Sequence, residues 1–297
     1  FFRNQIEDKF GTISNLLEWC GRGKFDPASC RVMVDSGSYA VTTAGRTVDM
    51  NQYIEFLHGQ AGHYNQCVNL DLQFKPKVGA ANFALMAANG LHKAIHVHHR
   101  PEAWKWLDGI RAACGPVLGL SPMPRARYRD KLEYLSMAHS LVPDRPFQWF
   151  GTIDIRLMKK FDVASGDSSS FAQTAAYCVI RTPGRKWDFT KKVGKDHYLS
   201  ATKADRRQFA KYVSSFRRPP PLPDGPIQVS DLWPKTSSRW GGLRNSYLAR
   251  AALNAAWYVW AEQDINASKN LIPLPDPDEI RSSERYLIDG DPPEGWS

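Results

Sequence analysis

Short apolar runs alternate with stretches of helical spacing between residues 31 and 168. Six such runs read RVMVDSG, CVNLDL, KAIHVHH, PVLGLS, FQWFGTID and FDVASGDS, and each reaches a Gly, Ser, Asp or His at or near its end. Between most of them lie segments such as NQYIEFLHGQAG and ANFALMAANG, in which apolar residues recur at helical intervals before a closing glycine. Apolar strands that alternate with helices are typical of a parallel sheet buried on both faces.

This alternation predicts an α/β fold, and within it a (β/α)8 TIM-like barrel with a basic C-terminal insertion and a helical tail. A doubly wound sheet fits less well, because no glycine-rich phosphate fingerprint follows any of the runs. The chain starts with Phe1, and we expect that a first strand can precede it. We expect a barrel core at 1–180, a basic segment with a Pro-rich linker at 181–226, and a C-terminal helix and tail at 227–297 that pack on the barrel.

The charge is concentrated in one stretch of the chain. The net charge is +9, and residues 181–218 carry twelve Lys and Arg against three Asp, so the remaining residues balance. Such a segment, with aromatic residues interleaved, indicates a polyanionic partner, of which nucleic acid is the commonest. The candidate contacts to a nucleic-acid backbone are Arg181, Arg185, Lys186, Lys191, Lys192, Lys195, Arg206 and Arg207.

Other classes of protein are disfavoured by composition. No run of about 18 apolar residues occurs, so we expect no membrane span. The five cysteines are scattered and never form a C-x-x-C pair, which disfavours a structural zinc site and a disulfide framework. A reducing cytoplasm is the expected compartment, and we expect no cofactor and no metal.

Three carboxylates stand at the ends of apolar runs: Asp35, Asp71 and Asp167. Taken singly, each fits a turn or a helix cap. In a parallel barrel, however, the carboxyl ends of the strands share one mouth, so the three side chains would meet there. Two separated carboxylates suit chemistry at an anomeric carbon, where one attacks the sugar and the other transfers a proton. A third can accept hydrogen bonds from the N–H groups of guanine, and nucleobase removal or exchange follows as a hypothesis.

Histidines in the run KAIHVHH are open to three interpretations. His96 and His98 alternate with Ile95 and Val97, so they share one face of a strand. A His-x-His strand can bind a metal in a barrel hydrolase, can contact a base or phosphate, or can be structural. The neighbouring His99 has no assigned role.

The order of these residues resembles the tRNA-guanine transglycosylases, which are (β/α)8 barrels. DSGSY at 35–39 looks like the Asp-Ser-Gly-Gly-Phe motif of that family, and Asp71 follows the next run, where the family has its guanine-reading aspartate. Gly119 in VLGLS matches a strand-ending glycine whose backbone reads the base, and Asp167 in SGDSSSF matches the nucleophile. The resemblance covers roughly residues 31–175 and is closest to the DNA-modifying branch of phages and bacterial islands.

The resemblance implies a base exchange in which guanine in DNA is replaced by a free 7-deazaguanine base, such as 7-cyano-7-deazaguanine or a relative. Asp167 would be the nucleophile and Asp35 the general acid and base. The implied substrate-binding residues are Asp71, Gly119, Ser36, His96, His98 and Ser168. No cofactor is implied, and a phage-encoded enzyme would act in the host cytoplasm.

Two departures from the family bear on this interpretation. The C-x-C-x-x-C…His zinc site of the tRNA enzymes is missing from the sequence, which favours DNA over tRNA, and the base-reading Gln-Gly-Gly strand is replaced by IHVHH. The alternatives are a tRNA-directed transglycosylase, a metal-dependent barrel hydrolase that uses His96 and His98, and a binding protein on a decayed barrel.

Overall fold

Two compact units make up the chain. The computed structural model describes residues 32–38, 47–72, 75–100, 102–113, 115–123, 126–167, 175–177, 179–182, 185–188, 202–214, 221–222, 225–226 and 247–282. Unit 1 comprises Phe1–Asp167 with Leu271–Ser297, and unit 2 comprises Ser168–Asn270. The sequence predicted a boundary near residue 180, whereas the units divide directly after Asp167.

Unit 1 contains parallel strands that pair in the order of the sequence. Its strands are β1 (Met33–Val34), β2 (Gln66–Cys67), β3 (Val97–His99), β4 (Leu118–Ser121), β5 (Phe147–Trp149) and β6 (Val163–Gly166). β1 pairs with β2, and β3 to β6 form a four-stranded sheet in that order. A parallel bridge from Val68, just after β2, to Ile95, just before β3, links the two ladders. The predicted α/β fold with parallel strands is therefore confirmed, and each of the six apolar runs contributes a strand.

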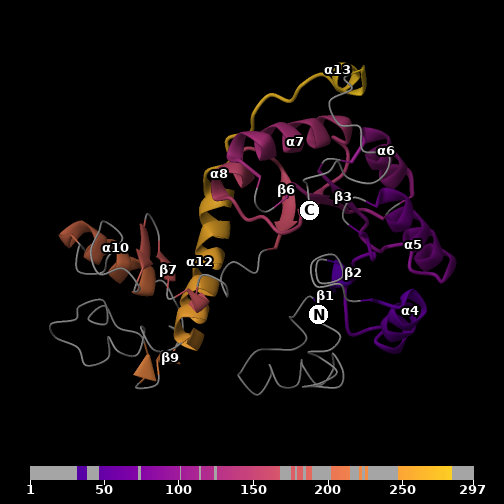
Figure 1. Cartoon of the computed structure of the whole chain (residues 1–297). Helices are drawn as coiled ribbons and strands as arrows, with labels where there is room; N and C mark the ends of the chain where they lie inside the picture. Colours follow the sequence, from indigo (N-terminus) through magenta and orange to yellow (C-terminus); the bar gives the residue numbers. More distant parts are fainter. Residues whose placement is uncertain are drawn as a thin grey trace. The chain divides into compact units, whose positions relative to one another are not determined.

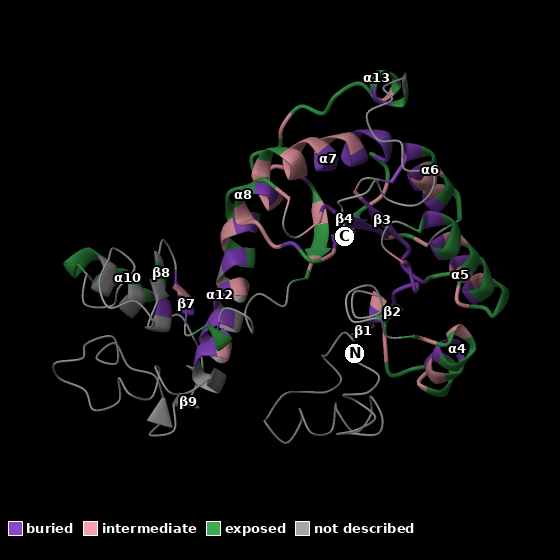
Figure 2. Cartoon of the chain, viewed as in Figure 1, coloured by how far each residue is buried: buried purple, intermediate pink, exposed green. Residues whose placement is uncertain are grey.

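Helices follow the strands of unit 1 and lie along one side of them (Figure 1). They are α4 (Met50–Gly59), α5 (Pro76–Ala88), α6 (Trp104–Ala113), α7 (Tyr128–Leu141) and α8 (Ile155–Met158). Asp49 caps α4, since its Oδ1 accepts a hydrogen bond from Asn51 N at 2.8 Å. Figure 2 shows that these helices combine buried and exposed faces, as expected of amphipathic helices on a buried sheet.

The core of unit 1 lies between the strands and these helices. Its larger cluster joins β4 and β5 to α6 and α7 around Trp149, Phe147 and Tyr134, all of which are fully buried. A second cluster packs α4 and α5 against β1 and β2 around Leu57 and Met86. β3, β4 and β5 are buried along their whole length, which explains why these strands read as continuous apolar runs, whereas β6 is partly exposed.

The C-terminal tail returns to unit 1. Ile272 N donates to Lys160 O at 3.2 Å, and helix α13 (Pro277–Ser282) packs against α7. Ile280 is buried in the larger core cluster, and Arg281 lies 3.6 Å from Asp108 of α6. The described part of the tail thus contributes to the core of the unit that carries the parallel strands.

Unit 2 holds the basic segment. β7 (Val179–Thr182) and β8 (Arg185–Asp188) form an antiparallel hairpin, followed by α10 (Lys203–Ser214), the short antiparallel pair β9 (Pro221–Leu222) and β10 (Gly225–Pro226), and α12 (Tyr247–Ala267). The C-terminal helix predicted within 227–297 corresponds to α12. Among the described helices, none is both long enough and apolar enough to cross a membrane.

Helix α12 is anchored to β7 by buried polar side chains. Asn254 is fully buried, accepts a hydrogen bond from Arg181 N at 2.7 Å and donates one to Val179 O at 3.0 Å. The hydroxyl of Tyr212 from α10 donates to Leu253 O at 3.0 Å. These bonds explain why α12 belongs to the same unit as the basic hairpin, although some 70 residues separate them in sequence.

Gly119 of β4 occupies a site with no room for a side chain. A Cβ there would lie 2.7 Å from Cγ2 of Val97 and 3.0 Å from His96 O and from Cε2 of Phe150. We expect Gly119→Ala to lower the free energy of unfolding by about 1–3 kcal/mol, as overpacking does in cores. Urea unfolding measures this. Gly109→Ala in α6 is the control, because nothing lies near its Cβ position, and it should stabilise the protein by about 0.5–1 kcal/mol. An equal response of both variants would contradict the packing argument.

Candidate active site

Asp35 lies within electrostatic reach of both other sequence-predicted carboxylates, Asp71 and Asp167, in unit 1. Asp35 directly follows β1, Asp71 lies a few residues after β2, and Asp167 directly follows β6. The charge of Asp71 raises the pKa of Asp35, and the charge of Asp35 raises the pKa of Asp167. The carboxyl ends of the first, second and sixth strands therefore bring their acidic side chains to a common region, as expected for parallel strands.

Asp167 is held in place by the loop after β5. Its Oδ1 accepts a hydrogen bond from Gly151 N at 3.0 Å, and its own N donates to Trp149 O at 3.0 Å. Gly151 has a φ of 66°, a conformation that favours glycine. Burial raises the pKa of Asp167 to about 6, and the charge of Asp35 adds to this, while the Gly151 hydrogen bond opposes it. The residue is nevertheless accessible to solvent, so a ligand can reach it.

Asp35 begins a tight turn. Its Oδ1 accepts a hydrogen bond from Gly37 N at 3.3 Å, and Gly37 has a φ of 76°. Burial is the main cause of its raised pKa, followed in the same direction by the charge of Asp71. Asp35 is solvent-accessible like Asp167, whereas its neighbour Ser36 is buried and its Oγ has no hydrogen-bond partner among the described residues. The turn thus accounts for the glycine of DSGSY and leaves the Asp35 carboxyl open to a ligand.

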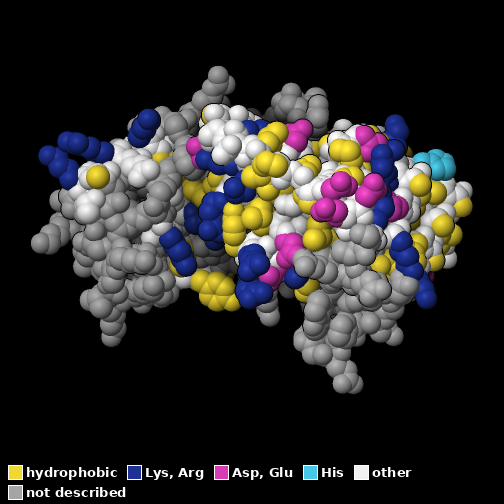
Figure 3. All heavy atoms as spheres, turned by 90° about the horizontal axis from the view of Figure 1, so that it is seen from above, with side chains coloured by type: hydrophobic (Ala, Val, Ile, Leu, Met, Phe, Trp, Pro, Cys, Tyr) yellow, Lys and Arg dark blue, Asp and Glu magenta, His cyan; other side chains and the backbone are white. Residues whose placement is uncertain are grey.

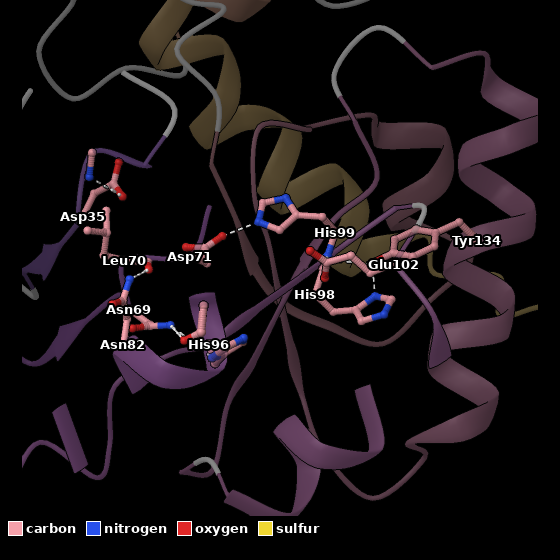
Figure 4. A network of polar contacts seen from close by, with 12 residues as sticks. Asp35, Asn69, Leu70, Asp71, Asn82, His96, His98, His99, Glu102 and Tyr134 are labelled. Atoms are coloured by element: carbon pink, nitrogen blue, oxygen red, sulfur yellow. Dashed lines mark hydrogen bonds and ion pairs between the residues drawn. The ribbon is translucent and has the colours of Figure 1, made fainter. Parts of the chain in front are cut away.

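Asp71 forms a buried ion pair with His99, shown in Figure 4. Asp71 Oδ2 contacts His99 Nε2 directly, and the two residues are 3% and 8% exposed. Glu102 completes the group, because its Oε2 accepts a hydrogen bond from His99 N at 2.9 Å. Burial raises the pKa of Glu102 to about 7. For His99, burial lowers the pKa, but the charges of Asp71 and Glu102 and the hydrogen bond to Asp71 outweigh it, and the pKa is raised.

His96 and His98 lie on the opposite face of β3 from His99 (Figure 4) and pack against the helices. The ring of His98 packs against Trp104 of α6 and Tyr134 of α7, whose rings also contact each other, and its Nδ1 lies 2.9 Å from the Tyr134 hydroxyl. Burial lowers the pKa of His98 to about 3. A neutral ring enclosed between two helices accounts for His98 as a core residue.

His96 has a similar environment. Its Nδ1 lies 3.1 Å from Nδ2 of Asn69, and its ring packs edge-on against Phe83 of α5. Burial lowers its pKa to about 4. His96 and His98 therefore share the face that packs against the helices, whereas His99 pairs with Asp71. Within the described parts of the chain, no three His, Cys, Asp or Glu side chains converge so that they could hold a metal ion.

The remaining predicted site residues are Gly119 of unit 1 and the residues from Ser168 onward, which belong to unit 2. Gly119 lies in β4, directly beside Val97 of β3. Ser168, Lys191, Lys192 and Lys195 lie outside the described residues, and of Arg185 and Arg206 only the backbone is described. Arg181 of β7 lies over the ring of Trp257, 5.4 Å from its centre. Lys186 of β8 and Arg207 of α10 are exposed.

A cationic row on α10 extends this set. Lys203, Arg207 and Lys211 are all exposed and follow one another at intervals of four residues, so they form one face of the helix. In Figure 3, Lys and Arg side chains gather at the left edge, where α10 lies in Figure 1. Only Arg207 of the three was among the sequence-predicted contacts.

The sequence analysis assigned no role to three residues of the site: His99, Glu102 and Gly151. The sequence does hold a signal for His99: it is the last residue of the apolar run KAIHVHH, just as Asp71 lies near the end of the run CVNLDL. Glu102 had no comparable signal, since it follows the strand by three residues in a loop. No protein-family model and no curated protein matches the chain.

Proposed function

We propose that this protein is a DNA-guanine transglycosylase that exchanges guanine in DNA for a 7-deazaguanine base. The observation that carries the proposal is that Asp35, after the first strand, feels the charge of Asp71, after the second, and that Asp167, after the sixth, feels the charge of Asp35. Asp35 and Asp167 are exposed residues, whereas Asp71 is buried in an ion pair with His99. This arrangement fits two groups that react and one that recognises a ligand.

A (β/α)8-type barrel is the architecture we propose for unit 1. Six parallel strands in sequence order, with their helices along one side, support it, because a doubly wound sheet would reverse its strand order at a switch point. The approach of the charges on Asp35 and Asp167, from the first and sixth strands, also favours a strongly curved sheet.

The proposed reaction has two displacements at one carbon. The target guanosine leaves the helix stack and enters the site. A carboxylate oxygen of Asp167 attacks C1′, the bond from C1′ to N9 breaks, and Asp35 gives its proton to the departing guanine. Asp35 then takes the N9 proton of the incoming 7-deazaguanine, whose N9 attacks C1′ and releases the Asp167 carboxylate. Two inversions retain the configuration, as in retaining glycosidases.

This scheme requires one proton on the pair Asp35–Asp167. Two neighbouring carboxylates favour the singly protonated state, because their like charges disfavour double ionisation. Burial raises the pKa of Asp167 to about 6, and burial followed by the charge of Asp71 raises the pKa of Asp35, so the pair keeps a proton at higher pH than ordinary carboxyls do. The pH dependence of the rate belongs to the pair and not to either residue.

We therefore expect a bell-shaped pH profile for the rate of guanine release, with an alkaline limb near pH 6. Above that pH the pair loses its proton and the rate should fall about tenfold per unit. Single-turnover release measured from pH 4 to 9 gives the profile. A rate that instead rises through pH 6 and stays level would contradict proton transfer within the pair.

Contacts to the DNA backbone are assigned to unit 2, supported by its basic segment and the exposed row on α10. We expect the triple variant Lys203→Gln, Arg207→Gln and Lys211→Gln to weaken DNA binding and to reduce the slope of log affinity against log salt by about 2–3. Fluorescence anisotropy at several salt concentrations measures this slope.

The matched control removes three lysines at the amino ends of strands: Lys93→Gln, Lys159→Gln and Lys160→Gln. These residues precede β3 and β6, at the edge of the sheet opposite the candidate site. The control should keep the wild-type slope. If both triple variants lower the slope equally, α10 has no specific part in binding.

The proposed function is tested with double-stranded DNA, single-stranded DNA and tRNA, each carrying labelled guanine, in excess 7-deazaguanine base. We expect label release from DNA and the modified nucleoside in its digest. Release from tRNA alone would keep the chemistry and contradict the choice of polymer. Binding of DNA without release from any substrate would contradict the transglycosylase function and favour a binding protein.

A further inference from the structure

Two cations stand directly opposite each other in the hairpin of unit 2. In the ladder of β7 with β8, the partner of Arg181 is Lys186. Arg181 N donates a hydrogen bond to the side chain of Asn254 in α12, and Val179 O accepts one from the same side chain. These backbone groups therefore face α12 and not β8. It follows that Arg181 and Lys186 form a non-hydrogen-bonded pair, in which the side chains come closest and the Cα atoms lie about 4.5 Å apart.

The side chain of Arg181 is held by α12, which lies beside β7 (Figure 2). Its guanidinium lies over the ring of Trp257, 5.4 Å from the ring centre. Trp257 follows Asn254 by three residues, so one face of the helix supports both the backbone and the side chain of Arg181. A guanidinium that stacks on an aromatic ring directs its N–H donors outward in its own plane, where they match the oxygens of a phosphate. The stacking thus fixes one cation of the pair.

This pairing is unfavourable unless an anion accompanies it. Like charges directly opposite each other destabilise a ladder. Neither cation forms an ion pair with a carboxylate among the described residues. The acidic residue of β8, Asp188, stands opposite Val179 in the register and not opposite a cation. An oxyanion bound by both cations would remove the repulsion, so the pair indicates a place for one.

We infer that Arg181 and Lys186 form a clamp that binds one phosphate group of the DNA backbone at the hairpin β7–β8. The inference rests on the proposed function only in taking DNA as the source of the phosphate. The guanidinium of Arg181 would bind two phosphate oxygens, and the exposed Lys186 would add a point charge. The clamp shares its support with the cationic row on α10, because Tyr212 of α10 bonds to Leu253 of α12, next to Asn254.

Hydrogen exchange of the β7 and β8 amides in the full wild-type chain tests the inference. Without DNA, raising NaCl from about 50 to about 500 mM should slow this exchange by about twofold, because salt screens the repulsion. Saturating duplex DNA at low salt should slow it by about tenfold or more, whereas inorganic phosphate at about 10 mM should slow it less than about twofold, since it brings no neighbouring contacts. Exchange that is unchanged or faster at high salt would overturn the inference, as would equal protection by phosphate and DNA.

Lys186→Glu separates the effect on the hairpin from the effect on binding. It turns the repulsion into an attraction to Arg181, so the free variant should exchange its hairpin amides about two- to fivefold more slowly than the wild type. Its DNA affinity should nevertheless fall by at least about tenfold at about 100 mM salt, measured by fluorescence anisotropy. A lysine with a purely structural role would not change the two quantities in opposite directions.

Lys93→Glu is the matched control, because it makes the same charge change at an exposed residue of unit 1. It should keep the hairpin exchange and the DNA affinity within about twofold of wild type. Two results would overturn the inference: hairpin exchange in Lys186→Glu that is as fast as in the wild type, and a DNA affinity that falls no further than in Lys93→Glu.

Failure of the proposed function gives a different result. A protein that binds DNA through Arg181 and Lys186 but releases no guanine would support this inference and contradict the transglycosylase. A protein that exchanges guanine in DNA with an unchanged DNA affinity in Lys186→Glu would do the reverse.

Discussion

Asp167→Asn should lower the rate of guanine release from DNA by at least about 10³-fold, because an amide cannot replace the carboxylate that attacks C1′. The asparagine oxygen can still accept the hydrogen bond from Gly151 N, so the loop geometry should be kept. Single-turnover release with saturating enzyme measures the chemical step separately from binding, and DNA affinity should stay within about threefold of wild type.

Asp154→Asn is the matched control for this prediction. Asp154 also follows a strand, but its carboxylate caps α8 and pairs with Arg156 at 2.8 Å. This variant should release guanine at nearly the wild-type rate. Release by Asp167→Asn within tenfold of wild type would exclude Asp167 as the nucleophile.

Asp71→Leu should lower the free energy of unfolding by about 3–5 kcal/mol at pH 6, because it leaves the imidazolium of His99 buried without its partner. The pKa of His99 is raised in the folded protein, so the pair stabilises the fold below the unfolded pKa of about 6.5. This contribution fades as the pH rises through the raised pKa. The effect of the substitution should therefore be smaller at pH 9 than at pH 6.

The double variant Asp71→Leu with His99→Leu provides the control. It removes both charges together, so it should recover much of the stability lost in the single variant. Urea unfolding of the wild type, both single variants and the double variant closes the cycle. A single-variant loss below about 1 kcal/mol at pH 6, or no recovery in the double variant, would contradict a buried ion pair.

Much of unit 1 was predictable because its central strands β3, β4 and β5 are buried throughout and its helices combine buried and exposed faces. Each of the six apolar runs contributes to a strand, but the strands are shorter than the runs. At the second run, CVNLDL, only Gln66 and Cys67 form the strand β2. The three carboxylates were predictable for the same reason, since parallel strands end at one edge.

The face of β3 that carries the site was not predictable from its sequence. Alternation placed His96 and His98 together, but a strand buried on both faces gives no polar side by which to orient it. Only the aromatic rings of Trp104 and Tyr134 show that His98 faces the helices, which leaves His99 to meet Asp71. The contact of His98 with Tyr134 spans 36 residues and that of His99 with Asp71 spans 28, which no local pattern encodes.

The position of the boundary between the two units was also not predictable from local sequence. Composition changes at the basic segment near residue 181, and the sequence placed the boundary there. Unit 2 instead begins at Ser168 and includes α12. Arg250 of this helix donates a hydrogen bond to Ala175 O, and Asn254 donates one to Val179 O. The alanine-rich sequence of α12 does not indicate which strand the helix packs against.

The most direct test of the central claim is mass spectrometry of the covalent intermediate. The protein is incubated with guanine-containing duplex DNA without an incoming base, denatured in acid and digested, and the peptides are searched for a sugar-phosphate adduct. We expect an adduct on Asp167 that disappears when a 7-deazaguanine base is added. Guanine release without any adduct, or an adduct on Asp35, would contradict the assignment of Asp167 as the nucleophile.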